Sequence, residues 1–361
     1  MALTLSLSKG EGYVRIPTSL KHMKYSSRFF LYAPLLLFLT LAAAAGANWW
    51  NMADALSRKL DALNGRKAMP GVTLSFASKT VGGFPFNLDV EFRNFRIEVA
   101  TDHGPTHWRS EKFALHALAY GREQMIFEAA GKQLLAWTDL KRQYHVLPFE
   151  VGEWHASSIV GDHGLARFDM DLIGLGSPAL IAARIQLHAR EHAGAIDLAV
   201  EADSVRLLGG LVSPFGEMIV LARANASAVP GKSFDAIRVG DASWEATIER
   251  WRVAQGVLHV DDLELNWNRF GAIGKGTLSL DPTHAVAGLL DFKAGGMTTF
   301  LEAAAHKHLS GGPNLGIAAA LIDRAARSGN NDAALLGAVI GFHDGVVSVG
   351  DEPATTEEPL Y

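Results

Sequence analysis

The sequence predicts an α+β protein: a single N-terminal transmembrane helix, then a large, mainly antiparallel, twisted β-sheet with helices grouped in the C-terminal part. Three observations carry this prediction. Residues 29–47 form an uncharged apolar run. Most of the chain after residue 71 alternates apolar and polar residues with a period of two, which is typical of half-buried strands. Helical periodicity returns between residues 243 and 327.

The apolar run is long enough to cross a membrane. At about 1.5 Å per helical residue it reaches roughly 28 Å, close to the ~30 Å hydrocarbon core of a bilayer. Lys21, Lys24 and Arg28 precede it, and Trp49 and Trp50 follow it. Basic residues stay cytoplasmic and tryptophan prefers the membrane–water interface, so we expect an inner-membrane, single-pass protein with most of its chain in the periplasm.

A cleaved signal sequence is the alternative to an uncleaved anchor. The second half of the run, residues 42–47, is small, and Ala43-x-Ala45 and Ala45-x-Ala47 both fit signal-peptidase cleavage. The run is longer than the usual signal core of about 7–15 residues, which favours the anchor. Met1 and Met23 are both candidate starts, because Met23 would begin a short basic leader.

The composition of the chain narrows its function class. The 361 residues carry a net charge of −5, and because residues 1–28 are basic, the remainder is more acidic still. An acidic exported part argues against nucleic acid as a partner, since phosphates need a basic face. The chain has no cysteine, which removes disulfides and thiolate chemistry.

The chain divides into segments by pattern. Trp49, Met52, Leu56, Leu60 and Leu63 form one stripe of an amphipathic helix that ends at Asn64-Gly65. We expect it to pack on the sheet or to lie near the membrane surface. The predicted segments are a cytoplasmic segment (1–28), the transmembrane helix or signal core (29–47), the amphipathic helix (48–65), a β-rich region (71–230), an α+β region (231–350) and an acidic tail (351–361).

Strands and helices are expected at specific places. Phe86, Leu88, Val90 and Phe92 alternate with polar residues, and the phase changes at Arg93-Asn94, which indicates a turn or bulge. Further strands are predicted at 113–120, 124–130, 133–137, 164–173, 179–190, 195–202, 257–267, 272–280, 286–293 and 346–349. Helices are predicted at 244–251, 297–308 and 315–327. The pattern leaves open whether residues 71–350 form one domain or two.

Several segments in order resemble a bacterial family known as domain of unknown function 2125. They are the apolar segment followed by Trp49-Trp50, 81–86 (VGGFPF), 128–131 with 135–137, 256–258 with 263–267, 276–281 (GTLSLD) and 344–350 (DGVVSVG). Residues 359–361 are also similar to the C-terminal residues of the family. The helix–strand–strand unit ending at Asp281 is also similar to AsmA-like envelope proteins. That resemblance implies an anchored, twisted sheet with an apolar groove and a role in envelope lipid homeostasis or transport.

Patterns that suggest catalysis have plainer explanations. His188-Ala-Arg-Glu-His192 matches a zinc-peptidase motif, but that motif needs a helix. The flanking residues alternate, and in a strand the two histidines would stand roughly 13 Å apart, too far to share a metal. We therefore predict no catalytic residue, no metal, no cofactor and no enzymatic activity, while an envelope hydrolase remains an alternative.

The leading functional hypothesis is a membrane-anchored envelope protein whose sheet binds or shelters lipid or another apolar ligand. The proposed apolar-ligand face consists of Phe84, Phe86, Leu88, Val90 and Phe92. The expected partners are the membrane through the anchor, lipid, and other envelope proteins. The alternative is a non-catalytic structural or assembly factor, because an apolar sheet face is more often an ordinary core than a groove.

Overall fold

The computed structural model describes residues 27–101, 104–119, 123–139, 142–208, 216–268, 270–295 and 336–356. The chain forms two compact units, residues 1–48 and residues 49–361. The helices predicted at 297–308 and 315–327 lie outside the described residues.

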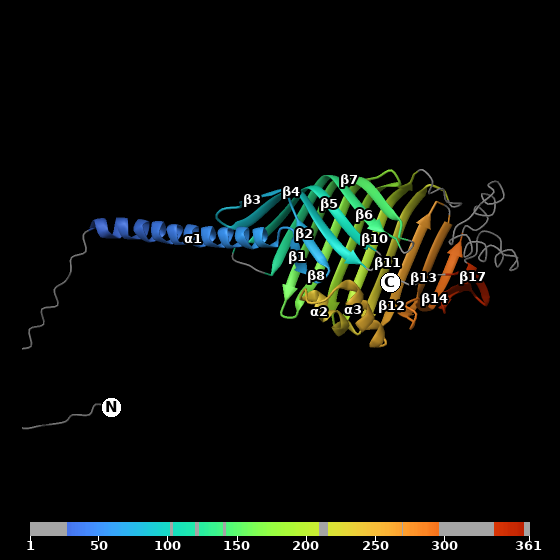
Figure 1. Cartoon of the computed structure of the whole chain (residues 1–361). Coiled ribbons are helices and arrows are strands. Elements are labelled where there is room, and N and C mark those ends of the chain that lie inside the picture. The colour runs from blue at the N-terminus through green and yellow to red at the C-terminus, as the bar shows by residue number, and fades with distance from the viewer. Residues whose placement is uncertain are drawn as a thin grey trace, which may run out of the picture. The chain divides into compact units, whose positions relative to one another are not determined.

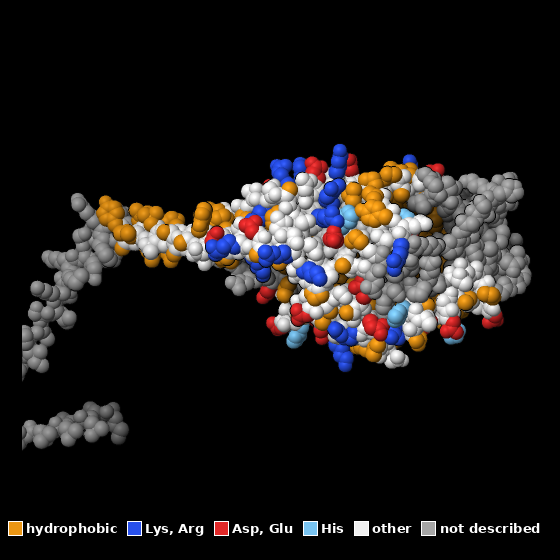
Figure 2. All heavy atoms as spheres, viewed as in Figure 1, with side chains coloured by type: hydrophobic (Ala, Val, Ile, Leu, Met, Phe, Trp, Pro, Cys, Tyr) orange, Lys and Arg blue, Asp and Glu red, His pale blue; other side chains and the backbone are white. Residues whose placement is uncertain are grey.

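The first unit contains most of the long helix α1 (Ser27–Leu63). By length and composition α1 can cross a membrane, with a mean hydropathy of 1.4, a criterion that a signal sequence also meets. Leu36, Phe38 and Leu41 are exposed along it, which suits side chains that face lipid. The hydroxyl of Thr40 donates to the carbonyl of Leu36, so this polar side chain is hydrogen-bonded within the helix. Figure 2 shows this part of α1 covered with apolar side chains.

In the described part of the second unit, seventeen strands form one sheet, coloured in chain order in Figure 1. The strands are β1 (Arg66–Met69), β2 (Val72–Ser75), β3 (Ser78–Gly82), β4 (Asn87–Thr101), β5 (Gly104–Leu118), β6 (Gln124–Thr138), β7 (Tyr144–Gly161), β8 (Gly164–Gly176), β9 (Leu180–His192), β10 (Ala195–Leu207), β11 (Met218–Val229), β12 (Val257–Trp267), β13 (Phe270–Leu280), β14 (Val286–Gly295), β15 (Leu336–His343), β16 (Val346–Val349) and β17 (Glu352–Thr356).

The sheet is an antiparallel meander. β1 pairs with β2, both β2 and β3 pair with β4, and from β4 onward each strand pairs with the next one along the chain. The pairing continues without a break through β11–β12, so the two regions predicted at 71–230 and 231–350 share one sheet. Most strands therefore bond to neighbours on both sides, which satisfies their backbone groups.

A line of irregular positions crosses the sheet and bends it. The residues of this bend line lie opposite one another, or one residue apart, from strand to strand: Asn94, Glu111, Gly131, Gly152, Gly174, Ala183 and Ser204. Every second strand has a positive φ there, from 50° at Ser204 to 76° at Gly131. Each irregularity changes the phase of the alternation, so Phe92 and Phe95 both face the core. The phase change predicted at Arg93-Asn94 is thus confirmed.

Burial shows which side of the bend is the inner one. The bend-line residues are exposed. Several residues next to the bend line are buried. Among them, Phe95, Ser110, Gln133, Val151 and Ala182 are only 0–5 % exposed. The face that carries Phe92 and Phe95 therefore lies on the inside of the bend.

Among the described residues, the helices that follow α1 do not group at the C-terminal part, so the predicted grouping is not borne out. The 3-10 helix η1 (Gly231–Phe234), α2 (Asp235–Arg238) and α3 (Trp244–Val253) form one insertion between β11 and β12, and six strands follow them. The sheet continues because β11 and β12 pair directly, so the helices pack on its inner face. The helix predicted at 244–251 itself is confirmed.

The predicted strands are mostly present but longer than expected. Three strands of eight or more residues were missed, β7, β11 and β15. Pro148 and Gly152 interrupt the alternation of β7, and β11 alternates alanine with polar residues over 222–228, which gives weak contrast in a hydropathy pattern. The predicted acidic tail contributes β17, which pairs with β16.

Candidate functional site

The inner face of the sheet carries an unbroken row of apolar side chains. In this apolar row each residue opposes the next on the neighbouring strand, across β3 to β12: Val81, Val90, Leu115, Phe127, Ala156, Met170, Leu187, Val200, Ala224 and Leu263. With strands about 4.8 Å apart, nine steps span roughly 43 Å. Half of a bilayer core is only about 15 Å deep, so the row is long enough for more than one acyl chain.

Helix α1 covers the first part of this row. Leu56 and Leu60 pack against the cluster of Val90, Phe92 and Phe113, and Met52 and Trp49 pack around Leu88. The Nε1 of Trp49 donates to the carbonyl of Asn87 at 2.7 Å. The stripe predicted on residues 48–65 therefore packs on the sheet, as the continuation of α1 and not as a separate helix.

The five residues predicted to form a ligand face occupy two different environments. Leu88, Val90 and Phe92 are buried under α1. Phe84 and Phe86 lie before β4 and are exposed. Alternation alone could not reveal this division, because it shows that three of the side chains share a face but not that a helix covers that face.

Farther along, the same face becomes more accessible. Met170, Leu172, Leu187 and Leu198 are only half-buried, and Val200 is 43 % exposed. The apolar row thus continues from a covered core under α1 to a surface in β8–β11 whose side chains remain reachable.

Helix α3 borders a partly open cavity on this inner face. The cavity has a volume of about 230 Å³ and is lined by apolar side chains that include Leu198, Ala228, Leu258 and Leu278 from the sheet and Trp251 from α3. A cavity of about 150 Å³ is sufficient for benzene, whereas drug-sized ligands occupy about 300–1,000 Å³. The size and lining therefore fit the end of one acyl chain.

Local interactions hold α3 over the cavity. The Ser243 hydroxyl accepts from the Ala246 amide at the start of α3. The Nε1 of Trp251 donates to the carbonyl of Val229 at 2.9 Å. A Cβ on Gly256 would lie 2.3 Å from the Trp251 ring, so only glycine permits this packing.

A buried arginine fixes α2 beside α3. Arg238 donates to the carbonyl of Leu165 at 2.7 Å and pairs with Glu191 at 2.9 Å and with Asp235 at 3.1 Å. Because its charge is buried and fully partnered, this contact ties the helical insertion to β8 and β9.

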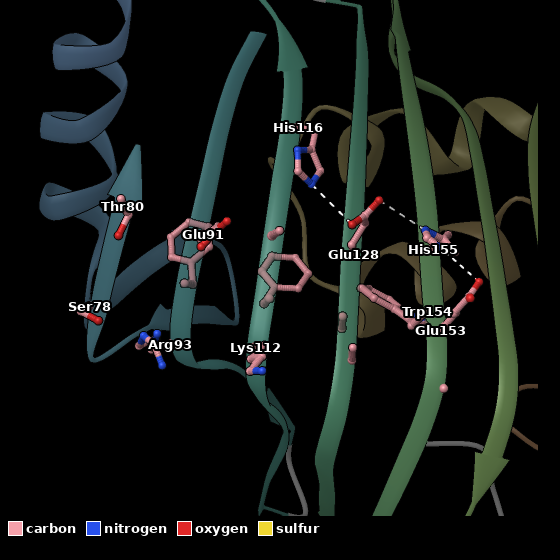
Figure 3. A pocket seen from close by; sticks show the side chains of 16 residues that line it. Ser78, Thr80, Glu91, Arg93, Lys112, His116, Glu128, Glu153, Trp154 and His155 are labelled. Carbon is pink, nitrogen blue, oxygen red and sulfur yellow. Dashed lines mark ion pairs between the residues drawn. The ribbon is translucent and has the colours of Figure 1, made fainter. Parts of the chain in front are cut away.

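The opposite, outer face is polar and carries a hollow of about 750 Å³ on β3–β7. Figure 3 shows His116, Glu128, His155 and Glu153 in one row across three strands. His155 lies 3.5 Å from both Glu128 and Glu153, and His116 lies 2.8 Å from Asp89. These side chains are about a third to two-thirds exposed, as expected of a solvated face with cross-strand ion pairs.

The zinc-like motif belongs to the same outer face. His188 and His192 lie on β9, so the strand predicted from the flanking residues is confirmed. His188 lies 2.7 Å from Asp169, and His192 lies 3.5 Å from Asp197. Within the described ranges, no group of three or more His, Cys, Asp or Glu residues is placed to hold a metal.

Ion pairs shift the pKa of two carboxyl groups on this face. The Arg184 guanidinium donates to both Asp171 oxygens, at 2.8 and 2.6 Å, and holds the pKa of Asp171 below its usual value. Burial opposes ionisation of Asp169, but hydrogen bonds from His188 and Arg167 bring its pKa below the usual value as well. Both carboxylates therefore remain charged and paired at neutral pH, as structural groups of the strands.

Comparison with known proteins gives one match. The family model described as "Uncharacterized protein conserved in bacteria (DUF2125)" matches residues 49–354, which include the sheet, the helical insertion and the cavity. No curated protein and no solved structure matches the chain. The matched region covers most of the chain, and the chain therefore belongs to the domain of unknown function 2125 family.

Proposed function

We propose that this protein is a membrane-anchored envelope protein that shelters an acyl chain of a lipid on the inner face of its sheet. The observation that carries the proposal is the apolar row, which leads from the core under α1 across accessible strands toward the cavity under α3. A soluble protein rarely leaves such a long apolar surface accessible unless the surface binds something.

The lining of the cavity supports an apolar ligand. Leu198, Leu258 and Leu278 offer no charge and no side-chain hydrogen bond, so specificity would come from shape and from exclusion of water. Alanine on β11 leaves the space, since Ala228 has a single methyl group where a larger side chain would fill it. An acyl tail is the ligand whose chemistry fits this lining.

The placement in the envelope rests on α1 and on the charge around it. Lys21, Lys24 and Arg28 precede the apolar run, and this supports a proposal in which α1 is anchored in the inner membrane and the second unit lies in the periplasm. This arrangement agrees with the resemblance to AsmA-like proteins, for which an anchored sheet with an apolar groove is the expected architecture.

The proposed role is non-catalytic. The one motif that suggested metal chemistry consists of two histidines that are paired with carboxylates on a strand. The histidines of the outer hollow are likewise engaged with neighbouring carboxylates.

A photoreactive fatty acid tests the proposal in the full chain. After irradiation in detergent, peptide mass spectrometry should find the label both on α1 and on the cavity strands, notably around Leu258 and Leu278. The label on α1 serves as an internal reference, because any apolar helix takes up the probe in detergent. Label on α1 alone would refute the groove.

The second candidate is a structural or assembly factor. It is favoured by the first part of the apolar row, where Leu88, Val90 and Phe92 form an ordinary core with α1. Under this alternative the cavity strands stay unlabelled, and the protein is recovered with envelope proteins and without bound lipid.

A further inference from the structure

Exposed apolar side chains lie where the apolar run of α1 ends and the sheet begins. Four of them are large and mostly exposed: Trp50 (69 %), Phe84 (62 %), Phe86 (66 %) and Leu118 (56 %). Trp50 belongs to α1, the two phenylalanines belong to the turn before β4, and Leu118 ends β5. We call these four side chains the exit patch.

Contacts within the second unit hold the patch together. The Phe84 ring meets the Trp49 ring edge-on at 5.3 Å. The Ala119 amide donates to the carbonyl of Phe86 at 2.8 Å, which joins the end of β5 to the turn. The segments that carry the four side chains therefore meet at the same end of the sheet.

The turn is rigid and points its aromatic rings outward. The Asn87 amide donates to the carbonyl of Gly83 at 2.8 Å, and Gly83 has a φ of 91°. A Cβ on Gly83 would lie 2.6 Å from Asp89 Oδ2 and 2.7 Å from the Asn87 carbonyl oxygen, so the turn requires glycine. Two exposed phenylalanines in a fixed turn expose apolar area that folding alone does not need.

The covalent position of Trp49 gives the depth of the patch. Trp49 follows the apolar run by two residues, which is about 3 Å along a helix. The interfacial layer of a bilayer is roughly 5–7 Å thick on each side of the hydrocarbon core. Phe84, in contact with Trp49, therefore falls within that layer.

The local charge fits the same location. Residues 82–88 and residues 47–53 carry no charged side chain, and the first acidic residue after the run is Asp54. Trp and Phe prefer the interface, where a ring can lie at headgroup depth.

We infer that the exit patch inserts into the interface of the same membrane that α1 spans and fixes the orientation of the sheet relative to that membrane. The inference rests on the proposed anchor. It adds a second point of attachment, and two points restrict rotation of the second unit about α1 where one point would not.

Depth-dependent quenching tests the inference, and the absence of cysteine from the chain makes single labels possible. Phe86→Cys, Phe38→Cys and Tyr144→Cys variants of the full chain carry a fluorescent label and are reconstituted in phosphatidylcholine vesicles. Nitroxides placed near the headgroup or deep in the acyl chain serve as quenchers. Phe38 reports the anchor, and Tyr144, exposed at the start of β7, is the matched control.

The expected result is quenching at Phe86 mainly by the shallow nitroxide, by at least twofold over Tyr144, and quenching at Phe38 mainly by the deep one. Quenching at Phe38 but only the Tyr144 level at Phe86 would overturn the inference and leave the anchor standing. A loss of quenching at both Phe38 and Phe86 would overturn the anchor and the inference together. A Leu118→Cys variant should behave as Phe86→Cys does, which guards against a local effect of one substitution.

Discussion

Filling the cavity under α3 should stabilise the protein and exclude its ligand. Ala228→Leu adds three carbon atoms at a buried position that lines the cavity. At about 0.8 kcal/mol for each buried methylene the gain is at most about 2.4 kcal/mol. A cavity of 230 Å³ costs at most about 5.5 kcal/mol at 24 cal/mol for each Å³, so the gain lies within what the space can provide. Because the new side chain does not fill the space perfectly, we expect the free energy of unfolding to rise by about 1–2 kcal/mol.

Urea unfolding and photolabelling of the full chain measure the two effects. With a slope of about 3 kcal/mol per molar urea, the midpoint should rise by about 0.5 M without a change of slope. Label on the cavity strands should fall at least fivefold while label on α1 stays constant. Ala100→Leu, at an exposed position of β4, is the matched control and should change neither value. A variant less stable than the parent by more than 1 kcal/mol, with unchanged label, would refute the reasoning.

Three further predictions concern residues that stabilise the sheet and its helical insertion. Gly256→Ala should destabilise by about 1–3 kcal/mol, because its Cβ would displace the Trp251 ring; an unchanged urea midpoint would contradict this packing. Gly174→Ala should cost about 1–2 kcal/mol, because φ is 66° there, whereas Gly174→Asn should cost less; equal costs in urea unfolding would argue against backbone strain. The lowered pKa of Asp171 means that its pair with Arg184 contributes stability above about pH 4 and loses it as the pH falls through the folded-state pKa. Asp171→Asn should therefore remove less than about 1 kcal/mol at pH 7 and less at pH 2 than at pH 7, as followed by unfolding at both pH values.

The local patterns of the sequence anticipated much of the fold. The alternation around Phe92 marked a strand, and the break at Asn94 marked an irregularity, because a phase change in a period of two is visible in one strand. That the irregularity continues through Gly131, Gly174 and Ser204 could not be predicted. It depends on the register of seven strands, which only pairing establishes.

The candidate site was harder to predict than the fold. Phe84, Phe86 and Leu88 look equivalent in an alternating pattern, yet two are exposed and one is covered by α1. The cavity residues escaped attention because Ala228 and Leu258 are far apart in the chain and neither is chemically unusual. One available signal was the alternation of small and polar residues in 222–228, which marks a strand with space on one face.

The sequence by itself determined the elements whose cause is local: the apolar run of α1, the stripe that continues it and the alternation of the strands. These follow from side-chain spacing along a helix or strand, a property of consecutive residues. The tertiary structure decided which apolar surface is core and which is accessible, and where α3 lies. Those outcomes depend on how distant segments pack, and here packing buries Val90 under α1, leaves Val200 accessible and places Trp251 over a cavity.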